Sequence, residues 1–320
     1  MASAPSSQTI RIQYIGPVFF GCLLNWCLLG ALTVQLYSFH VCFPKERTPI
    51  KGFVYILYIL DLAQTVGSTH YSYHVLVYGW GDLFALMTVT WSIAIVPILT
   101  GVISLAVQLF FAWRIWTLKR GNRLFQVSVV TLISAIGLMQ CVAAFVGGIK
   151  YALAGDTAAL ASMSNLVKVW LIGSFVCDIV IALAMLFILG SMRHKSHWQR
   201  TNGRIRKLMY HTVESGAITA VAAGVDLSLF LAAPNANYHL VLSFTLGKLY
   251  TNIVLATLNN RSSRTGAAEG SVSEVNILSE NFPLSVRRSQ GDTGGKSAMI
   301  HVSRDVQSDA ALSSNDLKAT

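Results

Sequence analysis

The sequence predicts an all-α membrane protein: a seven-transmembrane-helix bundle with the N-terminus outside, the C-terminus cytoplasmic and a disordered C-terminal tail. Three observations predict it. Hydrophobic residues make up 53% of the chain and charged residues only 12%, against about 25% charged residues in soluble domains. Seven apolar stretches follow one another, each long enough to cross a hydrocarbon core of about 30 Å. The loops between them are alternately rich and poor in Lys and Arg.

The first three stretches cover residues 15–39, 52–74 and 87–113. A polar segment, residues 1–14, precedes the first stretch, and we expect it to be a short extracellular N-terminus. The first stretch is too long for the apolar region of a signal peptide, so we expect it to stay as a membrane anchor. The third stretch contains Pro97, which predicts a kink.

Four further stretches complete the predicted bundle, which spans about residues 15–258. They cover residues 124–149, 166–190, 208–232 and 239–258. The sixth of the seven carries Gly and Ala at three- and four-residue spacing, which lets a neighbouring helix approach closely. Ser, Gly, Ala, Asp and Glu dominate residues 262–320 without an apolar period. Such a composition predicts a disordered cytoplasmic tail.

The distribution of Lys and Arg sets the predicted orientation. The first, third and fifth loops and the start of the tail are basic, whereas the second and sixth loops lack Lys and Arg. Basic loops stay in the cytoplasm, which places the N-terminus outside. The net charge of +10 is spread over these loops and suits the lipid bilayer, so we expect no nucleic-acid partner. The plasma membrane is the expected location.

Six charged residues fall within the apolar stretches: Lys168 and Glu214 lie near the ends of theirs, whereas Asp61, Asp178, Asp226 and Lys248 lie deeper. Charges inside a bilayer are costly, and they are usually paired or functional. Asp226 lies roughly 9 Å and Lys248 roughly 13 Å from the outer surface. Since consecutive helices are normally neighbours, we expect these two to pair. Asp178 is expected to share their cavity, as part of a ligand or ion pocket in the outer half of the bundle. The alternative is a structural ion pair that fixes helix register.

Asp61 begins a second polar pattern, in the second stretch. Gln64 and Ser68 follow at the third and seventh positions, so all three share one helix face, which must point into the bundle. This face predicts either a cation or proton site or a hydrogen-bonded packing seam between helices.

His70 and His74 are spaced by four residues near the outer end of the second stretch. Two imidazoles at that spacing can share a zinc ion, with Asp82 or His239 as a third ligand. Two ligands make only half a site, however, and an interfacial belt with the neighbouring tyrosines explains the same pattern. We therefore expect no metal centre, no cofactor and no enzyme.

Ser289 follows two arginines in the predicted tail. This short pattern resembles a site for a basic-directed kinase, which would regulate the protein by adding negative charge. We expect regulation there, and the sequence does not indicate a cytoplasmic signalling partner.

A family resemblance appears at the end of the bundle. Residues 246–261, LGKLYTNIVLATLNNR, resemble the closing signature of a fungal membrane family, domain of unknown function 6534 (DUF6534). Residues 212–221 and 108–116 and the acid Asp178 also resemble these proteins. The resemblance implies a multi-pass protein of basidiomycete-type fungi, with the named domain at about residues 173–261. It implies no catalytic residue, ligand or partner.

Three functional hypotheses follow from the sequence. The first is a receptor- or sensor-like protein that binds a small lipophilic ligand around Asp178, Asp226 and Lys248. The second is a transporter or channel that uses Asp61 and the same intramembrane charges. The third is a membrane zinc-dependent hydrolase, which would need bound metal at His70 and His74.

Overall fold

The computed structural model describes residues 11–80, 90–117, 123–154, 159–194, 199–233 and 236–260. All secondary structure in these ranges is helical. Five helices are long and apolar enough to cross a membrane. The structure therefore supports an integral membrane protein. That the helices cross the membrane seven times, and in which orientation, stays a prediction. The predicted tail with Ser289 lies outside the described residues, as do residues 1–10.

The first two spans are each built from an α-helix and a short π-helix. η1 (Arg11–Ile15) leads into α2 (Gly16–Cys42), and α3 (Thr48–Tyr73) continues into η2 (His74–Tyr78). Both α-helices have a proline in the first turn. Proline is tolerated there because the N–H groups of the first turn have no partner within the helix.

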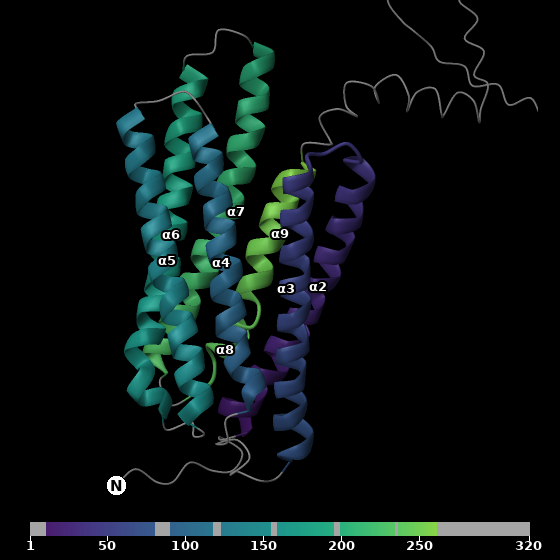
Figure 1. Ribbon diagram of the computed structural model, residues 1–320, viewed down its shortest axis with the longest axis vertical. Helices are drawn as coiled ribbons and strands as arrows, with labels where there is room; N and C mark the ends of the chain where they lie inside the picture. Colours follow the sequence, from purple (N-terminus) through teal and green to yellow (C-terminus); the bar gives the residue numbers. More distant parts are fainter. Residues whose placement is uncertain are drawn as a thin grey trace, which may run out of the picture. The chain divides into compact units, whose positions relative to one another are not determined.

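The next four helices follow in order and each packs against the one before it. They are α4 (Trp91–Thr117), α5 (Arg123–Ala154), α6 (Ala159–His194) and α7 (Gln199–Ala232). Figure 1 shows them as neighbouring columns. α4 begins at Trp91 rather than at the predicted residue 87, and residues 81–89 lie outside the described part of the chain. The apolar section of α7 covers Gly216–Ala232 and is shorter than the five long spans.

The predicted seventh span is not one continuous helix, which corrects the expectation from the sequence. It consists of α8 (Leu240–Ser243) and α9 (Leu246–Asn259), separated by a turn at Phe244 and Thr245. The Thr245 N–H donates to the Leu242 carbonyl at 2.9 Å, a spacing of three residues. α9 alone extends about 21 Å, which is shorter than a hydrocarbon core of about 30 Å.

α9 occupies a central place among the helices. It packs against α2, α3, α4 and α7, and Figure 1 shows it between α2 and α3 on one side and α4 and α7 on the other. The main apolar core gathers around it and includes Leu32, Leu57, Ile103, Met185 and Val254. The position of α9 places its side chains in contact with several helices at once.

α2 and α9 run parallel in a fixed register. The Asn252 amide donates to the Leu28 carbonyl at 3.3 Å, and the Asn259 amide donates to the Gln35 carbonyl at 2.8 Å. Both the donors and the acceptors are seven residues apart. A repeat of seven residues, two helical turns, keeps the same helix faces together.

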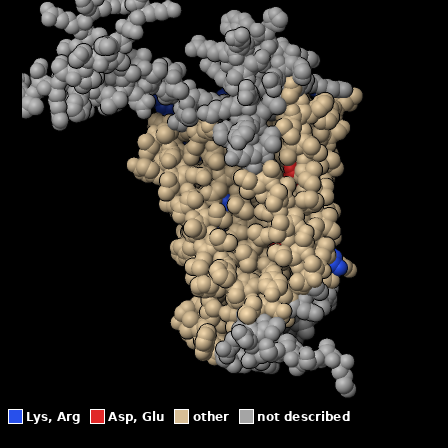
Figure 2. Space-filling view, turned by 180° about the vertical axis from the view of Figure 1, so that it is seen from behind, with Lys and Arg blue, Asp and Glu red and all other residues tan. Residues whose placement is uncertain are grey.

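The outer surface of the described helices is predominantly apolar. Figure 2 shows a face that is almost free of charged residues between the grey regions. Large apolar side chains on α2, α3 and α6 are exposed, among them Phe20, Val66 and Phe187. A soluble protein rarely exposes so much contiguous apolar surface, whereas lipid covers it at no cost.

Candidate functional site

Lys248 connects α9 to α3 in the middle of the bundle. Its exposed fraction is 0%, as is that of Asp61. The Lys248 Nζ donates to the Asp61 backbone carbonyl at 3.1 Å and to the Gln64 Oε1 at 3.3 Å. The neighbouring Gly247 allows this approach, because a Cβ there would lie 3.0 Å from Gln64 Oε1. We call Asp61, Gln64 and Lys248 the α3–α9 site.

The expected pair of Asp226 and Lys248 is wrong. Asp226 instead accepts the Ser243 hydroxyl, at 3.3 Å and 3.1 Å to its two carboxylate oxygens. α7 and α9 are neighbours, as expected from consecutive helices. The rotation of α9 nevertheless directs Lys248 toward α3, so chain order alone does not choose its partner.

The carboxylate of Asp61 is the unusual group of the α3–α9 site. Both of its oxygens are buried, and neither accepts a hydrogen bond from a described residue, although the Thr251 hydroxyl lies beside the carboxylate. The positive charge of Lys248 acts on this carboxylate. A buried acceptor without a donor is rare in proteins and calls for an explanation.

A buried polar seam extends from this site, and the predicted face of Asp61, Gln64 and Ser68 is confirmed as buried. The Gln64 amide donates to the Thr100 hydroxyl on α4 at 2.7 Å. The Asn25 amide on α2 donates to the Ser68 hydroxyl at 2.8 Å. Asn25 and Thr100 were not predicted as site residues, although a lone Asn within an apolar stretch was an available signal.

Asp178 forms a second site with the opposite face of α9. The Tyr250 hydroxyl donates to Asp178 Oδ2 at 2.8 Å, and the Thr219 hydroxyl also lies beside the carboxylate. The exposed fraction is 4% for Asp178 and 2% for Tyr250. We call Asp178, Thr219 and Tyr250 the α6–α9 site.

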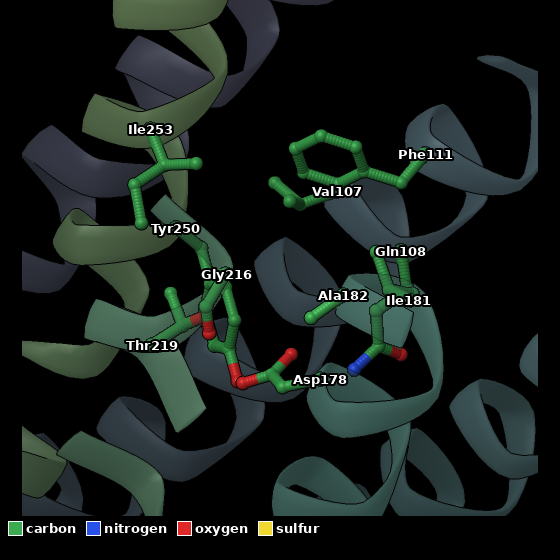
Figure 3. Close-up of a pocket in the computed structure, with 10 residues that line it drawn as sticks. All are labelled: Val107, Gln108, Phe111, Asp178, Ile181, Ala182, Gly216, Thr219, Tyr250 and Ile253. Atoms are coloured by element: carbon green, nitrogen blue, oxygen red, sulfur yellow. The ribbon is translucent and has the colours of Figure 1, made fainter. Parts of the chain in front are cut away.

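A cavity of about 20 Å³ adjoins the α6–α9 site, lined also by Gln108 and Phe111 of α4 (Figure 3). It lies beyond the middle of α4, toward the C-terminal end of that helix. Pockets for organic ligands measure about 300 Å³ or more. The cavity has room for about one water-sized guest.

Asp178 does not share a cavity with Asp226 and Lys248, which corrects a second expectation. Lys248 and Tyr250 are two residues apart on α9, so they point in directions about 200° apart around the helix axis. Asp61 therefore meets one face of α9, Asp178 meets the other, and Asp226 meets α8. Each of the three acids has its partner in the α8–α9 segment.

The two histidines have neighbours typical of a membrane interface. His70 Nδ1 lies 3.0 Å from the Ser92 hydroxyl, and its ring centroid lies 5.0 Å from that of Trp91. The His74 ring lies beside Tyr78. Within the described ranges, no group of three His, Cys, Asp or Glu residues could hold a metal ion. The possible third ligand Asp82 lies outside these ranges.

The motif at the end of the chain can now be compared with known families. Residues 174–263 match the model of a family of unknown function, DUF6534. The DUF6534 match agrees with the domain expected at about residues 173–261. It contains Asp178 and Asp226 and the whole α8–α9 segment, whereas Asp61 precedes it. No curated protein and no solved structure matches the chain.

The matched segment therefore contains Lys248 of the α3–α9 site and all three residues of the α6–α9 site. Its description gives no activity. The function must consequently be argued from the chemistry of these two sites.

Proposed function

We propose that the protein transports protons or a small monovalent cation across the membrane by exchange at Asp61. The supporting observation is a carboxylate that is fully buried, with no hydrogen-bond partner for either oxygen among the described residues. An ionisable group in this position is costly unless it is paired or takes part in function. A proton or a cation on the free oxygens relieves this cost.

Lys248 has a defined part in this exchange. Its Nζ is bound to the Asp61 carbonyl and to Gln64, which leaves the carboxylate oxygens open. When Asp61 is ionised, the ammonium group of Lys248 balances its charge. When a cation binds Asp61, the site carries an additional positive charge next to Lys248. Repulsion between the two then favours release, and binding remains reversible.

The polar seam supports transport over a purely structural ion pair. Gln64 extends the site to Thr100, and Asn25 and Ser68 continue it along α2 and α3. These side chains are fully or almost fully buried in an otherwise apolar bundle. A structural pair would need only its two charged groups, whereas an exchanging ion needs successive polar groups along its path.

Flux measurements in proteoliposomes test the proposal. We expect liposomes that contain the protein and an internal pH dye to acidify when a potassium diffusion potential, negative inside, is imposed. Tracer uptake of sodium and potassium ions is measured in parallel. The Asp61→Asn variant should reduce the active flux to that of protein-free liposomes. Asp226→Asn is the matched control, since Asp226 is an equally buried acid with its own Ser243 partner.

Two results would contradict the proposal. One is a wild-type protein that moves neither protons nor sodium or potassium ions. The other is an Asp61→Asn variant with wild-type flux. The receptor-like and zinc-hydrolase hypotheses stay predictions, to be tested by native mass spectrometry for a retained small molecule and by elemental analysis for zinc.

A further inference from the structure

We propose that the cavity beside Asp178 is a binding site for a monovalent cation, separate from the exchange at Asp61. The site lies on the other face of α9, and its parts come from α4, α6, α7 and α9. The charge of the cavity wall, the groups that face the cavity and the cavity's size all favour such an ion.

The charge of the wall is unbalanced. Asp178 is the one charged residue among those that line the cavity, and the others are neutral. Asp61, by comparison, has Lys248 beside it. An ionised carboxylate removed from water needs a compensating charge or a set of strong hydrogen bonds. At Asp178, no described side chain of the cavity supplies the positive charge.

The hydrogen-bond donors around Asp178 suit its anionic form. The Tyr250 hydroxyl donates to Oδ2, and the Thr219 hydroxyl lies beside the carboxylate. Charge-assisted hydrogen bonds of this kind are stronger than neutral ones. These neutral hydroxyl groups stabilise the carboxylate but leave the net negative charge of the wall in place.

Gln108, on the cavity wall, is held in place by its contacts with other side chains. Its amide nitrogen donates to the Ser104 hydroxyl at 3.2 Å, and its Oε1 accepts the amide of Gln140 from α5. The wall is therefore built by buried polar contacts rather than by mobile side chains. Because these side chains are already held in place, binding a ligand costs little conformational entropy.

The volume of the cavity and the chemical groups on its wall indicate which class of ligand it binds. About 20 Å³ admits one water-sized particle, and so a bare ion but not its hydration shell. The lone pairs of Asp178, Thr219 and Tyr250 provide the oxygen ligands that alkali cations and ammonium accept. The aromatic ring of Phe111 lies on the wall formed by α4, and such rings attract cations. Ammonium, potassium and sodium ions share this chemistry.

The test is equilibrium binding of radioactive thallium(I), a monovalent probe ion, to the purified full-length protein in detergent. We expect saturable binding that ammonium, potassium or sodium chloride displaces and that choline chloride, whose cation is too large, does not. The order of displacement identifies which ion the site prefers. In the Asp61→Asn background, which lacks the exchanging carboxylate of the α3–α9 site, Asp178→Asn should abolish the saturable binding, since it removes the charge and keeps an acceptor for Tyr250.

Matched variants locate the ion. Asp226→Asn and Asp61→Asn should both retain thallium binding, and Thr219→Val, which keeps the charge and the volume, should weaken it. The proposal is wrong if the wild type shows no saturable binding or if adding Asp178→Asn to the Asp61→Asn background leaves the binding unchanged. It is also wrong if Asp61→Asn alone abolishes binding, because the ion then lies at the α3–α9 site. Since the readout is binding, it does not depend on the flux measured for Asp61.

Discussion

The two faces of α9 each contact a buried carboxylate, and they stabilise it by different interactions. On one face, Asp61 lies beside the positive charge of Lys248 and the hydroxyl of Thr251, but neither carboxylate oxygen accepts a hydrogen bond from a described residue. On the other face, Asp178 accepts the hydroxyl of Tyr250, but no charged partner lines its cavity. In the α3–α9 site the carboxylate is balanced in charge, but its two oxygens accept no hydrogen bond from a described residue. The α6–α9 site is satisfied in hydrogen bonds and lacks charge balance.

This difference separates two contributions that are usually measured together. Coulombic pairing and hydrogen bonding both stabilise a buried carboxylate, and most buried ion pairs combine them. Here they are divided between Lys248 and Tyr250, two residues apart on one helix. Substitutions on the two faces should therefore have distinct effects.

The largest effect is expected from Lys248→Met, which tests the face that depends on charge. It leaves the carboxylate of Asp61 without a counter-charge and Gln64 Oε1 without its donor. We expect a loss of about 3 kcal/mol in the free energy of unfolding, measured by denaturant titration in micelles.

The double variant Asp61→Asn/Lys248→Met serves as its control. Removing both charges should recover most of the lost stability, because neither group then remains buried and unpaired. A double variant that is no more stable than Lys248→Met alone would show that Lys248 acts through packing, and the comparison between the faces would fail.

A smaller effect is expected from Tyr250→Phe, which tests the face that depends on hydrogen bonds. The substitution keeps the ring and removes the donor to Asp178 Oδ2. We expect a loss of about 2 kcal/mol in stability, because one buried carboxylate oxygen loses its partner. Tyr37→Phe is the matched control, since Tyr37 is 71% exposed, and it should leave the stability unchanged. Equal stabilities of the two variants would argue against a role of the hydroxyl.

The smallest effect is expected from Gly247→Ala, which tests how closely α9 must approach α3. The added Cβ would lie 3.0 Å from Gln64 Oε1 and 3.5 Å from the Ile103 Cδ1. Displacing Gln64 weakens its bond with Lys248, and we expect a loss of about 1 kcal/mol.

Gly30→Ala provides the comparison, because nothing lies within 4 Å of a Cβ at that position. It should be neutral or slightly stabilising, since Ala is the better helix former. Thermal unfolding of both variants in the same detergent measures the difference. A Gly247→Ala variant as stable as Gly30→Ala would mean that the α3–α9 contact accommodates the added methyl group without strain.

Much of the helical architecture could be predicted from local properties. The apolar stretches correspond to helices, and the face of Asp61, Gln64 and Ser68 is buried as its spacing predicted. The segment that resembles DUF6534 was also located within a few residues of its match. These features depend on composition and periodicity along one helix, which the sequence contains directly.

The partners of the charged residues could not be predicted in the same way. A helix turns about 100° per residue, so a rotation equivalent to one residue directs a side chain to another neighbour. The turn at Phe244 and Thr245 interrupts the last predicted span. The rotational setting of α9 beyond this turn does not follow from an unbroken helix through residues 239–258.

By itself, the sequence determined that this chain forms apolar helices suited to a membrane, and it identified the four charged residues that lie deep within them. Only the tertiary structure decided that Lys248 meets α3, that Asp178 meets Tyr250 and that Asp226 meets Ser243. The physical reason is that hydropathy is a property of each segment. The choice of partner depends on how several helices are rotated and packed around α9.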